Sequence, residues 1–326
     1  MIWKGSIAME NVNIRKVAVI GCGFVGSASA FALMQSGLFS EIVLIDVNAG
    51  KAEGEAMDIS HGIPFSRHMK VYAGTYDDIT DASIIIITAG AGQKPGESRL
   101  DLVSRNVSIY RSIIPEITRR GCPGILLVVS NPVDILTYVT LKLSGYPPER
   151  VIGSGTVLDS ARLKYSLGEL LGVDSKSVHA FIIGEHGDSE IAAFSCANIS
   201  GIGLDEFCEM RGYSDHVKKC HEIACEVKNS AYEIIQKKQA TYYGIAMSVR
   251  RICEVIIRDE KSILPISCIM NGEYGIRDVA LSMPAIIGKD GVETHVPISL
   301  DEEELAALRC SAETLRKILD ACALDA

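Results

Sequence analysis

The sequence contains no apolar run long enough to cross a membrane and no tract rich in lysine or arginine. Its longest apolar stretches, residues 82–92 and 125–129, are much shorter than the roughly 20 residues that a transmembrane helix needs. The formal net charge is −9, which opposes non-specific binding to the phosphate backbone of nucleic acids. We therefore expect neither a membrane nor a nucleic acid as a partner.

The signals of secretion and of a disulfide-bonded fold are also missing. The N-terminal stretch has no apolar core and no small-residue cleavage site, so we interpret residues 1–14 as a short extension instead of a signal peptide. The ten cysteines are scattered along the chain and form no Cys-x-x-Cys pair, which predicts reduced thiols. Together these features predict a cytoplasmic protein.

Two histidine–cysteine pairs raise the question of a metal site. His216 and Cys220, like His221 and Cys225, are four residues apart on a predicted helix, and both residue types bind zinc. Successive helical residues point about 100° apart, so the two pairs do not obviously converge. We expect an ordinary amphipathic helix here and no metal ion.

Composition and patterning predict a globular α/β protein. With 48% apolar and 22% charged residues over 326 positions, the chain can fill sizeable cores, which excludes the disordered and fibrous classes. Short runs rich in valine and isoleucine alternate with helical patterns such as residues 24–36, and such runs are typical of strands buried on both faces of a parallel sheet. The predicted strands are residues 15–20, 41–45, 70–73, 83–88, 125–129 and 150–152.

The second half of the chain has a different pattern. Long helical segments at 215–236 and 242–258 precede β-like segments at 263–270 and 279–287, a hairpin turn at 289–291, and a terminal helix that starts near Ser299. We therefore predict a Rossmann-type doubly wound parallel sheet in residues 15–155, followed by an α+β domain in residues 156–326.

A glycine-rich motif, GCGFVG at 21–26, lies between the first predicted strand and helix. Gly21, Gly23 and Gly26 permit a tight turn, close approach of a pyrophosphate, and packing of the helix on the sheet. Asp46 closes the second strand, where its carboxylate can accept hydrogen bonds from both ribose hydroxyls and would repel a 2′-phosphate. The motif predicts NAD rather than NADP; the alternative is a glycine turn that binds nothing.

His186 follows an apolar β-like run and lies in a glycine-flanked loop, IIGEHGDSE at 182–190. Histidine is the side chain whose pKa lies nearest neutrality, and it is suited to proton transfer. If LDSAR at 158–162 opens a helix, Asp159 and Arg162 share one face. A carboxylate that orients the histidine and a guanidinium that holds an anionic substrate would then lie together, although a plain surface turn is the alternative.

Two further loops follow predicted strands at the edge where open α/β sheets bind ligands. The loop AGAGQKPGESR at 89–99 is rich in glycine and ends in Arg99, as a closing lid with a cation would. The segment SNP at 130–132 brings the amide of Asn131 to the same edge. Alternatively, the first loop is merely exposed and Asn131 is a helix N-cap.

Taken together, the chain resembles the lactate/malate dehydrogenase family, and within it the bacterial L-lactate dehydrogenases. The resemblance runs from about Lys16 to the last helix and is most specific in GCGFVG with Asp46, GAGQKPGESR, SNPVD, GTVLDSAR, IIGEHGDSE and ATYYGIA at 240–246. It implies that His186 exchanges a proton with pyruvate or lactate, that Asp159 orients His186, and that Arg162 clamps the substrate carboxylate.

The resemblance also implies the remaining site residues. Arg99 would polarise the substrate carbonyl from the lid. The substrate pocket would include Gln93, Asn131 and Thr241. Besides the glycine motif and Asp46, the implied NAD contacts are Val25, Lys51, Tyr76, Gly90, Ala91, Ser112, Val129, Asn131 and Ser154.

Position 93 bears on the substrate. Malate dehydrogenases typically have arginine there to meet a second carboxylate, whereas Gln93 is neutral and suits the methyl end of pyruvate. The sequence therefore favours lactate dehydrogenase. The alternatives are a malate or other 2-hydroxy-acid dehydrogenase, or a non-catalytic NAD-binding protein on the same scaffold.

The family further implies a homotetramer and, in its allosteric bacterial members, activation by fructose 1,6-bisphosphate. The effector positions correspond to Lys164 and His179. The histidine matches, but Lys164 replaces the usual arginine and supplies a point charge in place of a planar fork. We expect activation that is present but weakened.

Overall fold

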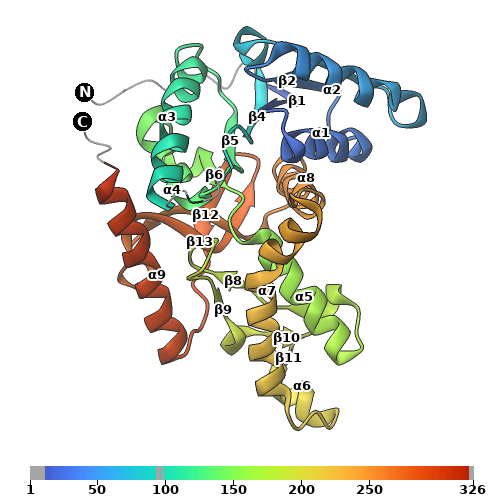
Figure 1. Ribbon diagram of the computed structural model, residues 1–326. Coiled ribbons are helices and arrows are strands. Elements are labelled where there is room, and N and C mark those ends of the chain that lie inside the picture. The colour runs from blue at the N-terminus through green and yellow to red at the C-terminus, as the bar shows by residue number, and fades with distance from the viewer. Residues whose placement is uncertain (1–11, 93–95, 97–98, 323–326) are drawn as a thin grey trace.

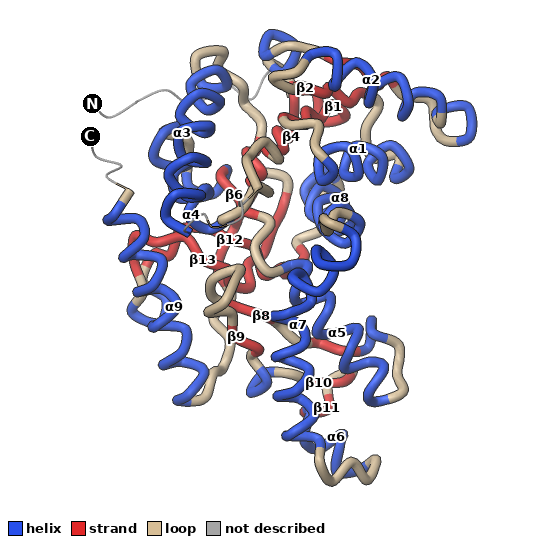
Figure 2. Tube along the Cα trace, in the orientation of Figure 1, coloured by secondary structure: helices blue, strands red, loops and turns tan. Residues whose placement is uncertain are grey.

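The computed structural model describes residues 12–92, 96 and 99–322. Over this part of the chain, nine strands form one sheet in the order β14-β13-β12-β6-β5-β4-β1-β2-β3, which runs through the middle of the molecule (Figure 2). Six of the strands are parallel neighbours: β1 (Asn13–Ile20), β2 (Glu41–Ile45), β3 (Lys70–Ala73), β4 (Ala82–Ile87), β5 (Ile125–Val128) and β6 (Val151–Gly153). The order 3-2-1-4-5-6 confirms the predicted Rossmann-type sheet.

Helices cover both faces of this sheet, as its apolar strands require (Figure 1). One face carries α1 (Phe24–Ser36), α2 (Ala49–His61) and α8 (Tyr243–Ile257); the other carries α3 (Arg99–Thr118), α4 (Val133–Ser144) and α9 (Glu302–Ala321). Every residue of β4 is buried, in agreement with the interpretation of valine- and isoleucine-rich runs as strands buried on both faces.

The sheet does not stop at the predicted domain boundary. Strands β12 (Ser262–Asn271), β13 (Arg277–Gly288) and β14 (Gly291–His295) belong to the second half of the chain, yet β12 pairs antiparallel with β6 through Ser267 and Gly153. The two predicted domains therefore share one continuous sheet, and the division near residue 155 stays a prediction.

A smaller core lies at the other end of the molecule. It is formed by α5 (Val157–Leu171), α6 (Leu204–Met210) and α7 (His216–Lys238) with the short strands β7 (Val178–His179), β8 (Ile182–Ile183), β9 (Ile191–Ala192), β10 (Asn198–Ile199) and β11 (Ile202–Gly203). Strand β8 leads into the loop of His186. Of the segments predicted for the second half, the helix at 215–236 belongs here as α7, whereas the β segments at 263–270 and 279–287 form β12 and β13 of the large sheet.

All ten cysteines are free thiols. In the described part of the chain, no helix combines the length and the apolar character needed to span a bilayer.

Candidate active site

The three glycines of the first motif each have a separate structural reason. Gly21 has a φ of +103°, and a Cβ there would lie 2.5 Å from the backbone nitrogen of Ala89. A Cβ on Gly26 would lie 1.8 Å from the carbonyl oxygen of Gly21, so helix α1 approaches the turn as closely as backbone allows. A Cβ on Gly23, in contrast, would meet nothing within 4 Å. The open space at Gly23 is where a pyrophosphate needs room.

Helix α1 begins at this open space. Its N-cap is Gly23, which provides no side-chain cap, so first-turn N–H groups remain for an anion. Asp46 supports the turn, because its Oδ2 accepts a hydrogen bond of 2.7 Å from the backbone N–H of Cys22. Its Oδ1 accepts another from Asn48, and each carboxylate oxygen retains a lone pair for a ribose hydroxyl. These residues fit NAD.

A buried asparagine that the sequence analysis missed joins the two neighbouring loops. Asn106 of α3 is fully buried. Its Oδ1 accepts a hydrogen bond of 2.7 Å from the N–H of Ala91, and its Nδ2 donates to the carbonyl oxygen of Asn131 at 2.8 Å. Asn106 thereby joins the start of the 89–99 loop to the Asn131 segment. The N-cap interpretation of Asn131 is wrong, because the cap of α4 is Pro132 and the helix begins at Val133.

The three central side chains come together as predicted. Nδ1 of His186 lies 2.6 Å from Oδ2 of Asp159, and Nη1 of Arg162 lies 2.8 Å from Oδ1 of the same carboxylate. Asp159 and Arg162 lie one turn apart at the start of α5, whereas His186 arrives from the loop after β8. Asp159 is almost fully buried, while the side chain of His186 retains 23% of its exposure. The histidine can therefore reach both its carboxylate and a substrate.

The electrostatics of this trio favour a charged histidine. Burial lowers the pKa of His186, but the charge and the hydrogen bond of Asp159 outweigh it and raise the pKa to about 9. Burial likewise opposes ionisation of Asp159, yet the neighbouring His186 and Arg162 hold its pKa below the ordinary value. At neutral pH the site holds an imidazolium that can donate a proton.

Two further carboxylates near His186 were not predicted. Asp134 of α4 is buried, and its Oδ2 accepts a hydrogen bond of 2.7 Å from the backbone N–H of His186; burial raises the pKa of this carboxyl group. Ligand-type atoms of Glu190, Asp159 and His186 all lie within 4.8 Å of one another. Burial, and then the charge of Asp159, raise the pKa of Glu190 to about 8. Asp134 lies in the SNPVD motif and Glu190 in IIGEHGDSE. Neither was singled out, because the sequence does not show that these carboxyl groups are buried near His186.

The second half of the chain reaches the glycine motif through an aromatic contact. The ring of Tyr242, next to Thr241, stacks on that of Phe24 with 5.4 Å between centroids. Thr241, just before α8, is the chain neighbour of this contact, and its place in the substrate pocket stays a prediction. Gln93 lies outside the described residues, and so does the side chain of Arg99, whose backbone begins α3.

Several predicted NAD contacts lie at the expected edge of the sheet. Lys51 is exposed in the first turn of α2, directly after β2. Four more lie at or just beyond the carboxyl ends of β4, β5 and β6, namely Gly90, Ala91, Val129 and Ser154. Val25 is in the first turn of α1. Their contacts with the cofactor stay predictions.

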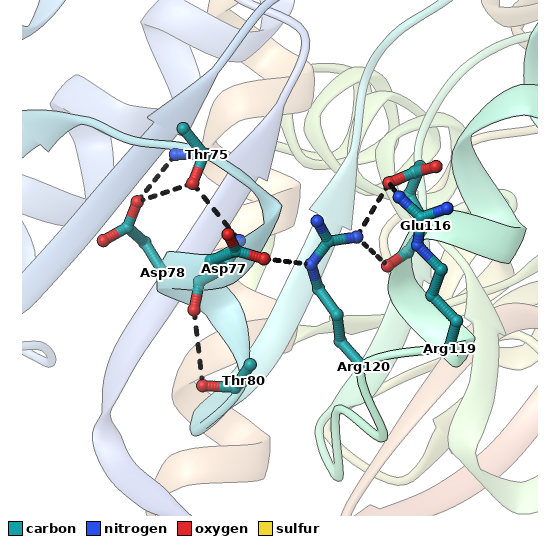
Figure 3. A network of polar contacts seen from close by, with 7 residues as sticks. All are labelled: Thr75, Asp77, Asp78, Thr80, Glu116, Arg119 and Arg120. Carbon is teal, nitrogen blue, oxygen red and sulfur yellow. Dashed lines mark hydrogen bonds and ion pairs between the residues drawn. The ribbon is translucent and has the colours of Figure 1, made fainter.

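Tyr76 lies just beyond the carboxyl end of β3, at the same edge of the sheet, whereas Ser112 lies on α3. Tyr76 lies in a short 3₁₀ turn that a polar network ties to the end of α3; Arg120 contacts Asp77 at 2.5 Å and Glu116 at 2.7 Å (Figure 3). The Arg120 guanidinium also lies 5.7 Å from the centre of the Tyr76 ring. Ser112 is exposed some 20 Å along α3 from its start. Their contacts with the cofactor likewise stay predictions.

The histidine–cysteine pairs of α7 point to separate neighbours. Nε2 of His216 lies 3.1 Å from Asp205, and its Nδ1 lies 2.8 Å from the carbonyl oxygen of Tyr213. The ring of His221 packs edge-on against Phe194. The two pairs do not converge, in line with the interpretation of this segment as an amphipathic helix.

The fold and the glycine motif are those of a dinucleotide-dependent oxidoreductase, and a histidine, an aspartate and an arginine lie together in it. The family model described as "lactate/malate dehydrogenase, NAD binding domain" matches residues 15–153, and that of the "alpha/beta C-terminal domain" matches residues 156–324. The chain therefore belongs to the lactate/malate dehydrogenase family.

Individual relatives agree with this assignment. The chain is 54% identical to L-lactate dehydrogenase from Acetivibrio thermocellus, over 95% of this chain and 98% of that one. It is 52% identical to L-lactate dehydrogenase 1 from Clostridium acetobutylicum, over 94% and 97% respectively. A solved lactate dehydrogenase from a Medee basin deep-sea metagenome library superposes with a TM-score of 0.91 at 46% identity, covering 94% of this chain and 98% of that one.

Proposed function

We propose that this protein is an NAD-dependent L-lactate dehydrogenase that interconverts pyruvate and L-lactate. The observation that carries the proposal is the contact of His186 and Arg162 with one buried carboxylate, Asp159. A histidine and a guanidinium held on one carboxylate support the roles of a proton donor and a carboxylate-binding cation in this reaction.

The residues divide the chemistry among them. Bound NADH supplies a hydride to the carbonyl carbon of pyruvate. His186 donates its proton to the carbonyl oxygen, which gains negative charge as the hydride arrives. Asp159 fixes the ring through Nδ1 and leaves Nε2 as the nitrogen that faces the substrate. In lactate oxidation, neutral His186 accepts the proton instead.

Arg162 is suited to hold the substrate carboxylate. Nη1 of its guanidinium forms an ion pair with Asp159, and among the described residues no other partner of the guanidinium is seen. The planar fork can therefore bind a carboxylate through its remaining N–H groups, a geometry that lysine lacks. Arg99 would join from the lid and stabilise the developing charge.

Pyruvate is the substrate favoured over oxaloacetate. Gln93 offers a neutral amide where a second carboxylate would need a cation, and the closely similar relatives are named L-lactate dehydrogenases. The test is kcat/KM with NADH for pyruvate, oxaloacetate and branched 2-oxo acids. We expect pyruvate to be preferred by at least tenfold; preference for oxaloacetate would assign the chain to malate dehydrogenase.

We further propose that the protein acts in the cytoplasm as a homotetramer. Ten free thiols agree with a reducing compartment. Large apolar side chains are exposed on the adjoining helices α1, α2 and α8, and such patches are typical of protein interfaces: Phe31, Met57, Tyr243 and Met247. Light scattering on the purified protein should give four times the chain mass of 35.1 kDa.

Weak activation by fructose 1,6-bisphosphate is the last part of the proposal. His179 is exposed on β7, against which α5 packs, and Lys164 lies on α5. Lys164 is half-buried with its Nζ 5.7 Å from the Phe181 ring, and burial lowers its pKa, so it is a poorer anion ligand than arginine. Lys164→Arg should strengthen the activation; activity unaffected by millimolar effector between pH 5 and 8 in both proteins would contradict it.

A further inference from the structure

A serine of the C-terminal helix α9 is hydrogen-bonded to the loop that carries His186. Ser311 of α9 is fully buried, and its Oγ accepts a hydrogen bond of 2.9 Å from the backbone N–H of Glu185, the residue before His186. The same Oγ lies 2.9 Å from Oγ of Ser189, whose hydroxyl donates to the Glu185 carboxylate. We call these three residues the Glu185 ring.

The hydroxyl protons determine the direction of this ring. A serine has one proton to donate, and Ser189 uses its own on the Glu185 carboxylate. The proton between the two serines must therefore come from Ser311. The chain of hydrogen bonds leaves the Glu185 backbone, passes through both hydroxyls, and returns to the Glu185 side chain. The Glu185 N–H, the two hydroxyls and Oε2 of Glu185 thus form a closed chain of hydrogen bonds, and such networks hold their members rigidly.

Neighbouring backbone groups are held by other elements. The N–H of Gly184 donates to the carbonyl oxygen of Ser282 on β13 at 2.9 Å, and the N–H of His186 donates to Asp134 on α4 at 2.7 Å. Gly184 has a φ of +86°, and a Cβ there would lie 3.0 Å from Oγ of Ser311. Three successive amides are thus held by three separate elements, and Ser311 provides the middle contact.

We propose that Ser311, 125 residues after His186, is a positioning residue that holds the His186 ring in line with the substrate through the Glu185 ring. The inference rests on the proposed dehydrogenase function. Its physical reason is that proton and hydride transfer depend steeply on geometry, and a misplacement of 1 Å can cost about 100-fold in rate. Ser311 touches neither substrate nor cofactor in this account.

The test compares Ser311→Ala with Thr314→Ala in the full-length protein. Thr314 is partly buried on the same helix, and its hydroxyl bonds only within α9, to the carbonyl oxygen of Cys310. We expect Ser311→Ala to lower kcat for pyruvate by about tenfold, with unchanged NADH affinity and a larger primary isotope effect from deuterated NADH, because the chemical step becomes slower. Thr314→Ala should match the wild type in all three.

Ser189→Ala removes the central hydroxyl and serves as the second variant if Ser311→Ala does not fold. The double variant should lose no more activity than Ser311→Ala, since both changes act through Glu185. A kcat and isotope effect within twofold of the wild type in both single variants would overturn the inference. Failure of the wild type to reduce any 2-oxo acid would instead overturn the proposed function.

Discussion

Nδ1 of His186 lies 2.6 Å from Oδ2 of Asp159, although the two residues are 27 positions apart and belong to different elements. The aspartate lies near the start of α5 and is buried there, so its charge acts on the histidine with little screening. The pairing raises the pKa of His186 above that of an ordinary histidine despite the burial of the ring. The pairing therefore favours charged His186, the form that donates a proton in pyruvate reduction, over neutral His186, the form that accepts one in lactate oxidation.

The first prediction concerns pH. Pyruvate reduction needs charged His186, so kcat/KM should fall as the pH rises through about 9. Asp159→Asn removes the charge that raises this pKa, and the decline should then begin at a lower pH, with lower turnover overall. The matched control is Asp188→Asn, an exposed carboxylate in the same loop. A pH profile of Asp159→Asn that superimposes on the wild type would show that Asp159 does not set this pKa.

The second prediction separates the glycines of the first motif. Gly26→Ala places a Cβ 1.8 Å from a carbonyl oxygen and should destabilise the fold by about 1–3 kcal/mol. Gly23→Ala meets nothing within 4 Å in the protein, so stability should change little while NADH binding weakens by at least tenfold. Thermal unfolding and NADH fluorescence measure the two effects. Equal NADH affinity in Gly23→Ala and the wild type would place the pyrophosphate elsewhere.

The third prediction concerns the helix end before Thr241. Gln239 closes α7 with a φ of +71°, a conformation that costs non-glycine residues about 1–2 kcal/mol. Gln239→Gly should therefore raise the free energy of unfolding by about 0.5–1 kcal/mol, after the greater entropy of glycine in the unfolded chain is subtracted. The control is Gln236→Gly. Gln236 lies inside α7, so glycine at this position should lower the free energy of unfolding. Urea unfolding at one protein concentration tests both.

The fourth prediction addresses specificity. Gln93→Arg should shift the kcat/KM ratio from pyruvate towards oxaloacetate by about 100-fold or more. An arginine can pair with a second carboxylate but lies unpaired beside a methyl group, which costs about 2–5 kcal/mol. NADH affinity should remain the same. A ratio that moves less than about tenfold would show that residue 93 does not face the variable end of the substrate.

Local patterns were sufficient to predict much of this protein. Runs of β-branched residues located β2 and β3 to the residue, and the spacing of Asp159 and Arg162 predicted that they share one face of a helix, where the structure shows them in contact. These features depend on neighbours in the sequence, where periodicity and glycine positions carry the signal. His186 became recognisable only in combination with Asp159 and Arg162, because a glycine-flanked histidine alone is equally compatible with a surface turn.

Long-range packing was not predictable in this way. Asn106 joins two loops, and Ser311 reaches Glu185 across 126 positions, yet an asparagine or a serine inside a helix has no distinctive pattern. The pairing of Gly153 with Ser267, which continues the sheet from one half of the chain to the other, depends on how the two halves pack. Burial determines these contacts, and burial is a property of the completed fold.

The most direct test of the account is pyruvate reduction by His186→Gln at saturating NADH, with NADH affinity measured on the same preparation. The ring of His186 is the proposed proton donor and belongs to a different loop from the glycine motif, so turnover should fall by about 10² to 10⁴ while the NADH dissociation constant stays within twofold of the wild type. Turnover close to that of the wild type, or a loss of activity explained entirely by weaker NADH binding, would contradict the assignment of His186 as the acid–base group.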